Sequence, residues 1–189
     1  MGAACGNREA FMAGEDVFDV IVIGAGPAGE VAAGRAVRGG LSAAIVERRL
    51  VGGECNFYGC IPSKSLLWPM TLTAEVSRMP GLELAGPIDA GAVLARRDEF
   101  VGHYGDAPQV SWVESVPVGF VRGQGRLAGP LRVEVTIPDG GVRALRAGHA
   151  VVLATGSDPW ILRCPGCGRH ARGRTGKRPA SSRCPSGWS

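Results

Sequence analysis

Two cysteines five positions apart carry the most distinctive chemistry of this chain. Cys55 and Cys60 lie in the run Gly-Gly-Glu-Cys-Asn-Phe-Tyr-Gly-Cys-Ile-Pro-Ser-Lys, which covers residues 52–64. A C-x4-C spacing on a loop that enters a helix can close into a small disulfide ring. Cys60 is expected at the N-terminus of that helix, where the helix dipole stabilises a thiolate. Lys64 follows on the same helical face and would bring a positive charge nearby. The run therefore predicts a redox-active dithiol.

Two plainer interpretations compete with redox chemistry. The cysteines could be buried and act only as small hydrophobic side chains. They could also be half of a zinc site, but such a site needs two further ligands and none lies nearby in the sequence. We therefore expect no metal at this position.

A second candidate site precedes the cysteines by about 30 residues. Gly24, Gly26 and Gly29 form the pattern G-x-G-x-x-G between an apolar strand and an Ala-rich helix. In such a loop the first glycine permits a tight turn, the second lets backbone N–H groups approach a pyrophosphate, and the third lets helix and strand pack closely. Glu47 ends the next strand, where a carboxylate can bind ribose hydroxyls. A glycine-rich turn without a ligand is the alternative, and the loop alone does not distinguish FAD from NAD.

Hydrophobic patterning predicts the elements that would position these residues. A buried strand, a helix and a second strand make one βαβ unit, as expected for an α/β protein with a parallel sheet. Two helical patterns follow the cysteines, the second with Val93, Leu94, Phe100 and Val101 on one face. Short strands then form a small β-meander near residues 110–148, before a final buried strand. The predicted strands cover residues 18–23, 42–46, 116–121, 131–137 and 149–154, and the predicted helices residues 28–38, 61–78 and 88–104.

Composition excludes several classes of protein. No apolar run reaches the ~18 residues of a membrane span, so no membrane association is expected. Residues 1–16 contain four charged side chains and no long apolar core, which is typical of a loose leader rather than of a secretory signal. A reducing, cytoplasmic environment is therefore expected.

The net charge of +4 belongs to one end of the chain. Residues 162–189 hold seven of the 21 basic residues and none of the 17 acidic ones, which leaves 14 basic and 17 acidic residues in residues 1–161. The body of the protein is thus slightly acidic, and nothing in its charge favours nucleic-acid binding.

Together the two motifs resemble those of the pyridine nucleotide–disulfide oxidoreductases, in particular the group that contains dihydrolipoamide dehydrogenase, glutathione reductase and mercuric reductase. The run over residues 52–64 is the most specific likeness. Two shorter runs add to it, namely Arg-Gly-Gln-Gly-Arg-Leu at residues 122–127 and Ala-Thr-Gly-Ser at residues 154–157. The resemblance covers residues 17–161, and it implies a Rossmann-like FAD-binding domain with a parallel sheet, flanking helices and the β-meander.

The resemblance also implies roles for residues. Cys55 would be the thiol that exchanges with substrate, and Cys60 the thiol that faces the flavin. Electrons would pass from NAD(P)H through FAD and the Cys55–Cys60 disulfide to a disulfide or metal substrate, or in reverse. The residues expected at the cofactor are Gly24, Gly26, Pro27, Ala28, Gly29, Glu47, Arg48, Gly53, Glu54, Cys55, Cys60, Lys64, Gly125, Ala154, Thr155 and Gly156.

Members of that family are longer than this chain. They add an NAD(P) domain and an interface domain, so NAD(P) binding and a homodimer are expected of full-length relatives and not of this truncated chain. The substrate would be a small or protein-bound disulfide. The alternatives are a mercuric reductase-like enzyme and a non-catalytic FAD-binding fragment, and the chain alone is expected to be inactive.

The basic tail, residues 162–189, has almost no apolar periodicity and is expected to be unstructured. Its Arg, Gly, Pro and Cys content is typical of GC-rich DNA translated in a shifted frame. With a suitable choice among the permissible codons, restoring one C after Ile161 yields a family-like continuation. We interpret the tail as out of frame. The alternative is zinc or nucleic-acid binding through Cys164, Cys167, His170, Cys184 and the basic residues.

Overall fold

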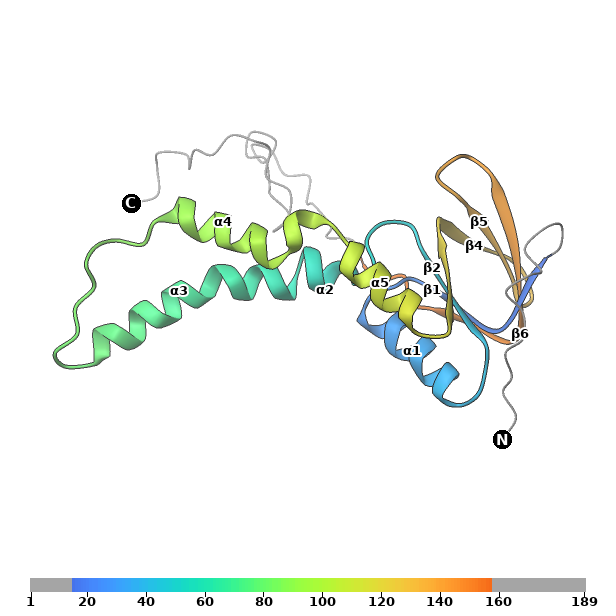
Figure 1. The fold of residues 1–189 in the computed structure, drawn as a ribbon, viewed down its shortest axis with the longest axis horizontal. Coiled ribbons are helices and arrows are strands. Elements are labelled where there is room, and N and C mark those ends of the chain that lie inside the picture. The colour runs from blue at the N-terminus through green and yellow to red at the C-terminus, as the bar shows by residue number, and fades with distance from the viewer. Residues whose placement is uncertain (1–14, 158–189) are drawn as a thin grey trace, which may run out of the picture.

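The computed structural model describes residues 15–157, which alternate between strands and helices (Figure 1). The tail and the leader discussed above lie outside this range, apart from the last two leader residues, Glu15 and Asp16, of which Asp16 begins the first strand. The strands are β1 (Asp16–Ile23), β2 (Ala43–Glu47), β3 (Val118–Arg122), β4 (Gln124–Gly129), β5 (Arg132–Thr136) and β6 (Val142–Leu153). The helices are α1 (Pro27–Arg38), α2 (Gly53–Phe57), α3 (Cys60–Arg78), α4 (Ala90–Phe100) and α5 (Ala107–Ser115), with a 3-10 turn at Gly102–Tyr104.

The strands form one sheet in the order β3-β2-β1-β6-β5-β4. Its first four strands are parallel, which confirms the predicted α/β fold with a Rossmann-like parallel sheet. The last two pairings are antiparallel and make the meander. The long strand β6 belongs to both parts, because residues 142–146 pair with β5 while the strand also runs parallel to β1.

The predicted extent of the meander was wrong at its N-terminal end. Residues 107–115 form helix α5, not a strand, and β3 is the outermost parallel strand beside β2. Pro108 fits the first turn of α5, and Val110 and Val113 lie three residues apart and pack onto the sheet. The buried residues of this segment thus have helical spacing, which explains why it is a helix and not part of the meander.

Apolar side chains cover both faces of the parallel strands. Val20 and Val22 of β1 join one core with Ala33 of α1 and Val113 of α5. The alternate residues Ile21 and Ile23 join a second core with residues of β2, β3, β5 and β6. Burial on both faces is why these strands are continuously apolar in the sequence.

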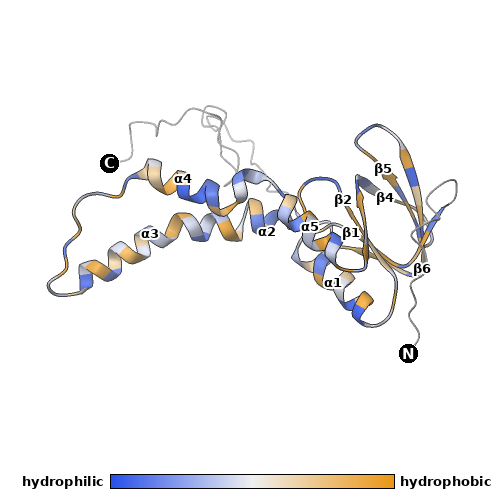
Figure 2. Ribbon diagram, viewed as in Figure 1, coloured by the Kyte–Doolittle hydropathy of each residue, from blue (hydrophilic) through white to orange (hydrophobic). Residues whose placement is uncertain are grey.

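Helices α3 and α4 form an arm that extends away from the sheet (Figure 1). Much of its surface is apolar, as the orange stretches of α3 in Figure 2 show. The predicted apolar face of the second helix was only partly right, because Val101 is buried whereas the side chain of Phe100 is 58% exposed. Phe100 instead lies under the guanidinium of Arg96, 4.4 Å from its ring centre.

Within residues 15–157, none of the helices combines the length and the apolar character needed to cross a bilayer.

Candidate functional site

The glycine loop between β1 and α1 has two packing glycines and one open glycine. A side chain at Gly24 would clash with the carbonyl oxygen of Ala154, and one at Gly29 would clash with the carbonyl oxygen of Gly24. Gly24 also has a φ of +109°, which a residue with a side chain rarely adopts. At Gly26, by contrast, no heavy atom outside the glycine and its two chain neighbours lies within 4 Å of where a Cβ would stand. The loop therefore keeps an open space at the N-terminus of α1, where a helix can bind an anion.

Helix α2, which carries Cys55, packs directly against this loop. A Cβ at Gly53 would lie 2.8 Å from the Cα of Gly26, and the backbone N–H of Gly52 donates to Ala25 at 2.7 Å. In the structure the backbone that approaches Gly53 is that of the glycine loop, and Gly52 instead approaches the Asn56 side chain. The dithiol region and the glycine loop thus form one unit.

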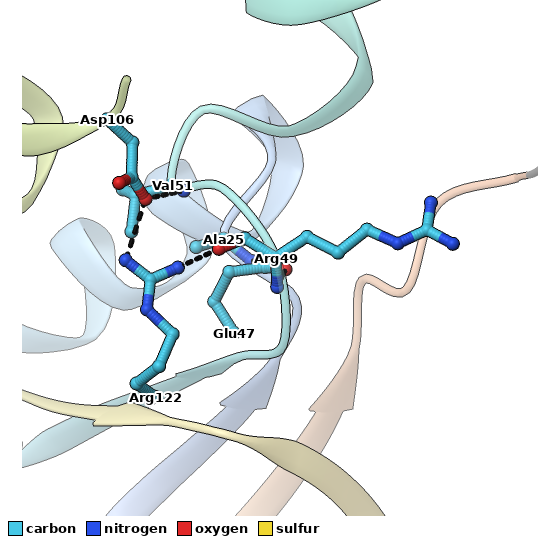
Figure 3. A network of polar contacts seen from close by, with 6 residues as sticks. All are labelled: Ala25, Glu47, Arg49, Val51, Asp106 and Arg122. Carbon is cyan, nitrogen blue, oxygen red and sulfur yellow. Dashed lines mark hydrogen bonds and ion pairs between the residues drawn. The ribbon is translucent and has the colours of Figure 1, made fainter. Parts of the chain in front are cut away.

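Glu47 lies at the carboxyl end of β2, as predicted, and its carboxylate connects two loops. One oxygen accepts the N–H of Ala25 at 2.8 Å and the other accepts the N–H of Arg49 at 2.7 Å (Figure 3). A carboxylate has about four acceptor positions, so about two remain for hydroxyl groups of a ligand. The two backbone donors fix the orientation of the carboxylate in advance.

An ion pair that sequence reasoning missed holds the loop that follows Glu47. Asp106 accepts the backbone N–H of Val51 at 2.8 Å and a guanidinium nitrogen of Arg122 at 2.7 Å. A second nitrogen of Arg122 donates to the carbonyl oxygen of Arg49 (Figure 3). Arg122 had been noted only as part of a family-like run. The position of both residues next to the ends of predicted strands and helices was the one signal available.

Two connected grooves run along the carboxyl edge of the parallel strands. They have volumes of about 80 Å³ and about 160 Å³, and Glu47, Arg48 and Thr155 line both. Ten predicted cofactor residues line them, namely Gly24, Gly26, Glu47, Arg48, Gly53, Glu54, Gly125, Ala154, Thr155 and Gly156. The main lining residues that the sequence did not single out are Arg49, Leu50, Tyr58, Gly123, Gln124 and Ser157.

The remaining predicted residues lie beside the grooves and not in their walls. Pro27 and Ala28 form the exposed first turn of α1, and Gly29 is buried beneath it. Cys55, Cys60 and Lys64 lie on α2 and α3, which begin next to Gly53 and Glu54 of the groove wall.

The two cysteines are free thiols and lie next to each other. Cys55 was expected on a loop but lies within the short helix α2, while Cys60 is the first residue of α3, as predicted for the helix start. A side-chain hydrogen bond with Cys60 raises the pKa of the Cys55 thiol, and burial raises it further. The positive charge of Lys64 acts in the opposite direction on the same pKa, so Lys64 is near the pair. Cys60 is the more exposed of the two.

No cluster of three His, Cys, Asp or Glu side chains suited to a metal ion occurs in residues 15–157. What the site offers is an open anion position, a fixed carboxylate and an adjacent pair of thiols.

Comparison with known proteins finds a matching family and similar sequences. Residues 18–181 match the family described as pyridine nucleotide-disulphide oxidoreductase. The chain is 39% identical over 148 residues to dihydrolipoyl dehydrogenase 3 of Pseudomonas aeruginosa, which covers 75% of this chain and 31% of the relative. It is 35% identical over 153 residues to leghemoglobin reductase of Vigna unguiculata, covering 78% of this chain and 29% of the relative.

A mitochondrial dihydrolipoyl dehydrogenase of Dictyostelium discoideum is 36% identical over 146 residues, again with 29% of its length covered. The chain thus spans less than a third of the length of these relatives.

Proposed function

This chain belongs to the pyridine nucleotide-disulphide oxidoreductase family, and on that premise we propose that residues 17–161 are its FAD-binding domain with a redox-active dithiol. The proposal rests on one observation, which is that the three parts of the site lie next to one another. The open glycine position, the fixed carboxylate of Glu47 and the thiol helix line or border one groove system at the carboxyl edge of a parallel sheet. Ligands of doubly wound folds bind at this edge.

The residues present fit an adenine dinucleotide. The space above Gly26 and the N-terminus of α1 would receive the pyrophosphate. The remaining acceptor positions of Glu47 would bind the adenosine ribose, and the groove between Gly123 and Gly125 would hold the adenine. Thr155 and Gly156 line the other groove, which leads toward α2 and the thiols.

Bound FAD would supply two-electron transfer between a nicotinamide and the thiol pair. The protein's own part is to hold Cys55 and Cys60 within hydrogen-bonding reach of each other and to keep Lys64 nearby. Reduction of the Cys55–Cys60 disulfide takes two electrons and two protons and yields the two thiols seen in the structure. A thiolate formed at Cys55 would then attack the disulfide of a substrate, forming a mixed disulfide with one substrate sulfur and releasing the other, which takes up a proton. Attack by the thiolate of Cys60 on the mixed disulfide would release the first sulfur and restore the Cys55–Cys60 disulfide.

A full-length protein with this domain would reduce a disulfide with NAD(P)H or, in reverse, oxidise a dithiol with NAD(P)⁺, with a dihydrolipoyl group as the preferred substrate class. Two of the relatives above are named dihydrolipoyl dehydrogenases, which supports this substrate class, and the third is named a leghemoglobin reductase. NAD(P) binding, a homodimer and a cytoplasmic location are further parts of this proposal.

The test is flavin binding by the purified chain and by a variant that fills the open glycine position. Gly26 has an extended backbone (φ −79°, ψ 178°), which a residue with a side chain adopts without strain. Gly26→Val should therefore fold normally but obstruct the pyrophosphate position. We expect the wild-type chain to take up FAD and the variant to bind it at least tenfold more weakly, as measured by titration of flavin fluorescence.

Gly86→Val is the matched control, because position 86 is also open but lies far from the grooves, in the loop between α3 and α4. It should bind FAD like the wild type. A folded wild-type chain that binds no flavin, or a Gly26→Val variant that binds it undiminished, would overturn the proposal.

A further inference from the structure

A second cavity, separate from the grooves, lies between α1, α5 and the sheet. Its volume is about 290 Å³, close to the lower end of the range for small-molecule sites. Most of its wall is aliphatic and is formed by Ala33, Val37, Ile45, Val113, Val116 and Val118. These residues border one of the two hydrophobic cores, so the cavity is an opening in an otherwise packed face.

Glu30 stands at one end of this apolar cavity. It lies in the first turn of α1 and is only half-exposed, and burial raises the pKa of its carboxyl group. Among residues 15–157, no side chain or backbone group donates a hydrogen bond to this carboxylate, and no cation forms an ion pair with it. A half-buried carboxylate without a donor is costly for a protein to keep.

A hollow of about 250 Å³ adjoins this cavity at Glu30. Glu30 and Trp112 line both spaces, and Asn56, Pro108 and Gln109 complete the second one. The amide oxygen of Gln109 is buried, and no donor in the described part of the chain reaches it. Glu30, an acceptor that lacks a donor, therefore borders the hollow, while the unsatisfied Oε1 of Gln109 is closed to solvent.

We propose that this two-part cavity is a binding site for a small organic ammonium ion with an apolar body. The ammonium group would donate hydrogen bonds to Glu30, with the ring of Trp112 available for a cation–π contact. The apolar body would fill the aliphatic cavity. Arg38 also lines that cavity, but it lies eight residues along α1 from Glu30, or about 12 Å, at the opposite end.

The test is binding of 2-phenylethylammonium to the full chain by isothermal titration calorimetry. A ligand of this size is expected to bind with a Kd of about 0.1–1 mM. Two probes share its body, namely 2-phenylethanol, which lacks the charge, and 3-phenylpropionate, which carries the opposite charge. Both should bind at least tenfold more weakly than the ammonium ion.

Two variants test the two parts of the cavity. Glu30→Gln removes the charge with little change of shape and should weaken binding of the ammonium probe about tenfold or more. Gly34→Leu should abolish binding, because Gly34 lines the apolar cavity and no heavy atom lies within 4 Å of where its Cβ would stand. Leucine is also a better helix former than glycine, so this variant should fold at least as well as the wild type.

Glu114→Gln on the exposed side of α5 is the control for a lost carboxylate and should bind like the wild type. Undiminished binding by Glu30→Gln and Gly34→Leu would overturn the site, and equal binding of all three probes would overturn its selectivity for ammonium. Absence of any binding would overturn it altogether. None of these results depends on whether the chain binds FAD, because the cavity shares no lining residue with the grooves.

Discussion

Cys55 and Cys60 differ in their surroundings although they are chemically the same. Cys55 is half-buried and shares a hydrogen bond with Cys60, which favours the neutral thiol of Cys55, while Lys64 favours its thiolate. The hydrogen bond with Cys60 has the larger effect, so the pKa of Cys55 lies above that of an ordinary thiol. Because the thiolate is the nucleophile, alkylation of Cys55 should become fast only at a higher pH than for an ordinary cysteine.

Removing the hydrogen-bond partner tests this assignment. We expect Cys60→Ala to lower the pKa of Cys55, and Lys64→Met to raise it, with Cys60→Ser intermediate because serine keeps a polar partner. The measurement is the rate of iodoacetamide labelling of the Cys55 peptide against pH, followed by mass spectrometry on the reduced chain. Unchanged pH profiles in Cys60→Ala and Lys64→Met would show that the two side chains do not act on Cys55.

Glu30 should make stability depend on pH in the direction opposite to that of most carboxylates. Burial raises its pKa in the folded chain, so the folded state binds the proton more tightly than the unfolded state does. Ionised Glu30 therefore destabilises the fold above its folded pKa, and this penalty disappears as the pH falls below the unfolded value. Since the group is about half-exposed, solvent screening keeps the effect small.

We expect Glu30→Gln to raise the Tm at pH 7 by about 1–2 °C and to leave it unchanged near pH 3.5, as measured by calorimetry. Glu114→Gln is the control and should change the Tm at neither pH. A variant that loses stability at pH 7 would mean that the Glu30 carboxylate makes a favourable contact.

At the scale of elements, two side chains fix the loop between β2 and α2, one just before α5 and one at the end of β3. Residues 48–52 link the carboxylate of Glu47 to the thiol helix, and Asp106 and Arg122 each bind the backbone of this loop. The side chains of this ion pair are 16% and 28% exposed, so they are better shielded than a surface pair. The pair therefore positions the loop without lining the grooves itself.

We expect Arg122→Met to destabilise the fold by roughly 1–3 kcal/mol, because it leaves Asp106 without its cation. It should also speed hydrogen exchange at the amide of Val51 and weaken FAD binding. Arg126→Gln is the matched control, since Arg126 pairs with Glu134 on an exposed surface and should contribute about 0.5 kcal/mol or less. Loss of stability with unchanged exchange at Val51 would mean that the pair stabilises the fold but does not position the loop.

The same elements show what the sequence could predict. The βαβ unit and its glycine loop were predictable because each signal is local, and the structure has the strand, helix and second strand within one or two residues of the expected limits. The start of α3 at Cys60 and its end at Arg78 followed from Pro62 and from Met79-Pro80-Gly81 in the same way.

The contacts that the sequence did not predict are not local. The hydrogen bond from Val51 to Asp106 spans 55 residues, and that from Arg122 to Arg49 spans 73. Nothing in the spacing of these residues indicates that the crossover through α3, α4 and α5 returns the chain to the loop after β2. The open space at Gly26 was predicted from its motif, whereas the approach of Gly53 to Gly26 required the packing of α2.

At the scale of the whole molecule, the helical arm is the least covered part of the described chain. On α3 the side chains of Leu67, Trp68, Met70 and Leu72 are each 47–60% exposed. The i,i+3 spacing of residues 67 and 70 and the i,i+4 spacing of residues 68 and 72 make the members of each pair neighbours on the helix surface. Contiguous apolar surface of this kind marks a face that other protein covers or that drives association.

We therefore expect the purified chain to self-associate at micromolar concentrations through the arm. The double variant Leu67→Glu and Met70→Lys should shift the chain toward the monomer in sedimentation velocity experiments, because it places charges on that apolar side. Exposed helix positions tolerate such changes within about 0.5 kcal/mol, so the Tm should be nearly unchanged and unfolding would not explain the shift.

Val31→Lys provides the comparison, since Val31 is also 54% exposed but lies on α1, at the body of the molecule. If Val31→Lys disperses the chain and the arm variant does not, the associating surface is on the sheet-and-helix body instead. If the associating surface is on the arm, the flavin and ammonium titrations are best made on the arm variant. The arm residues line neither the grooves nor the second cavity, so this variant should bind both ligands like the wild type.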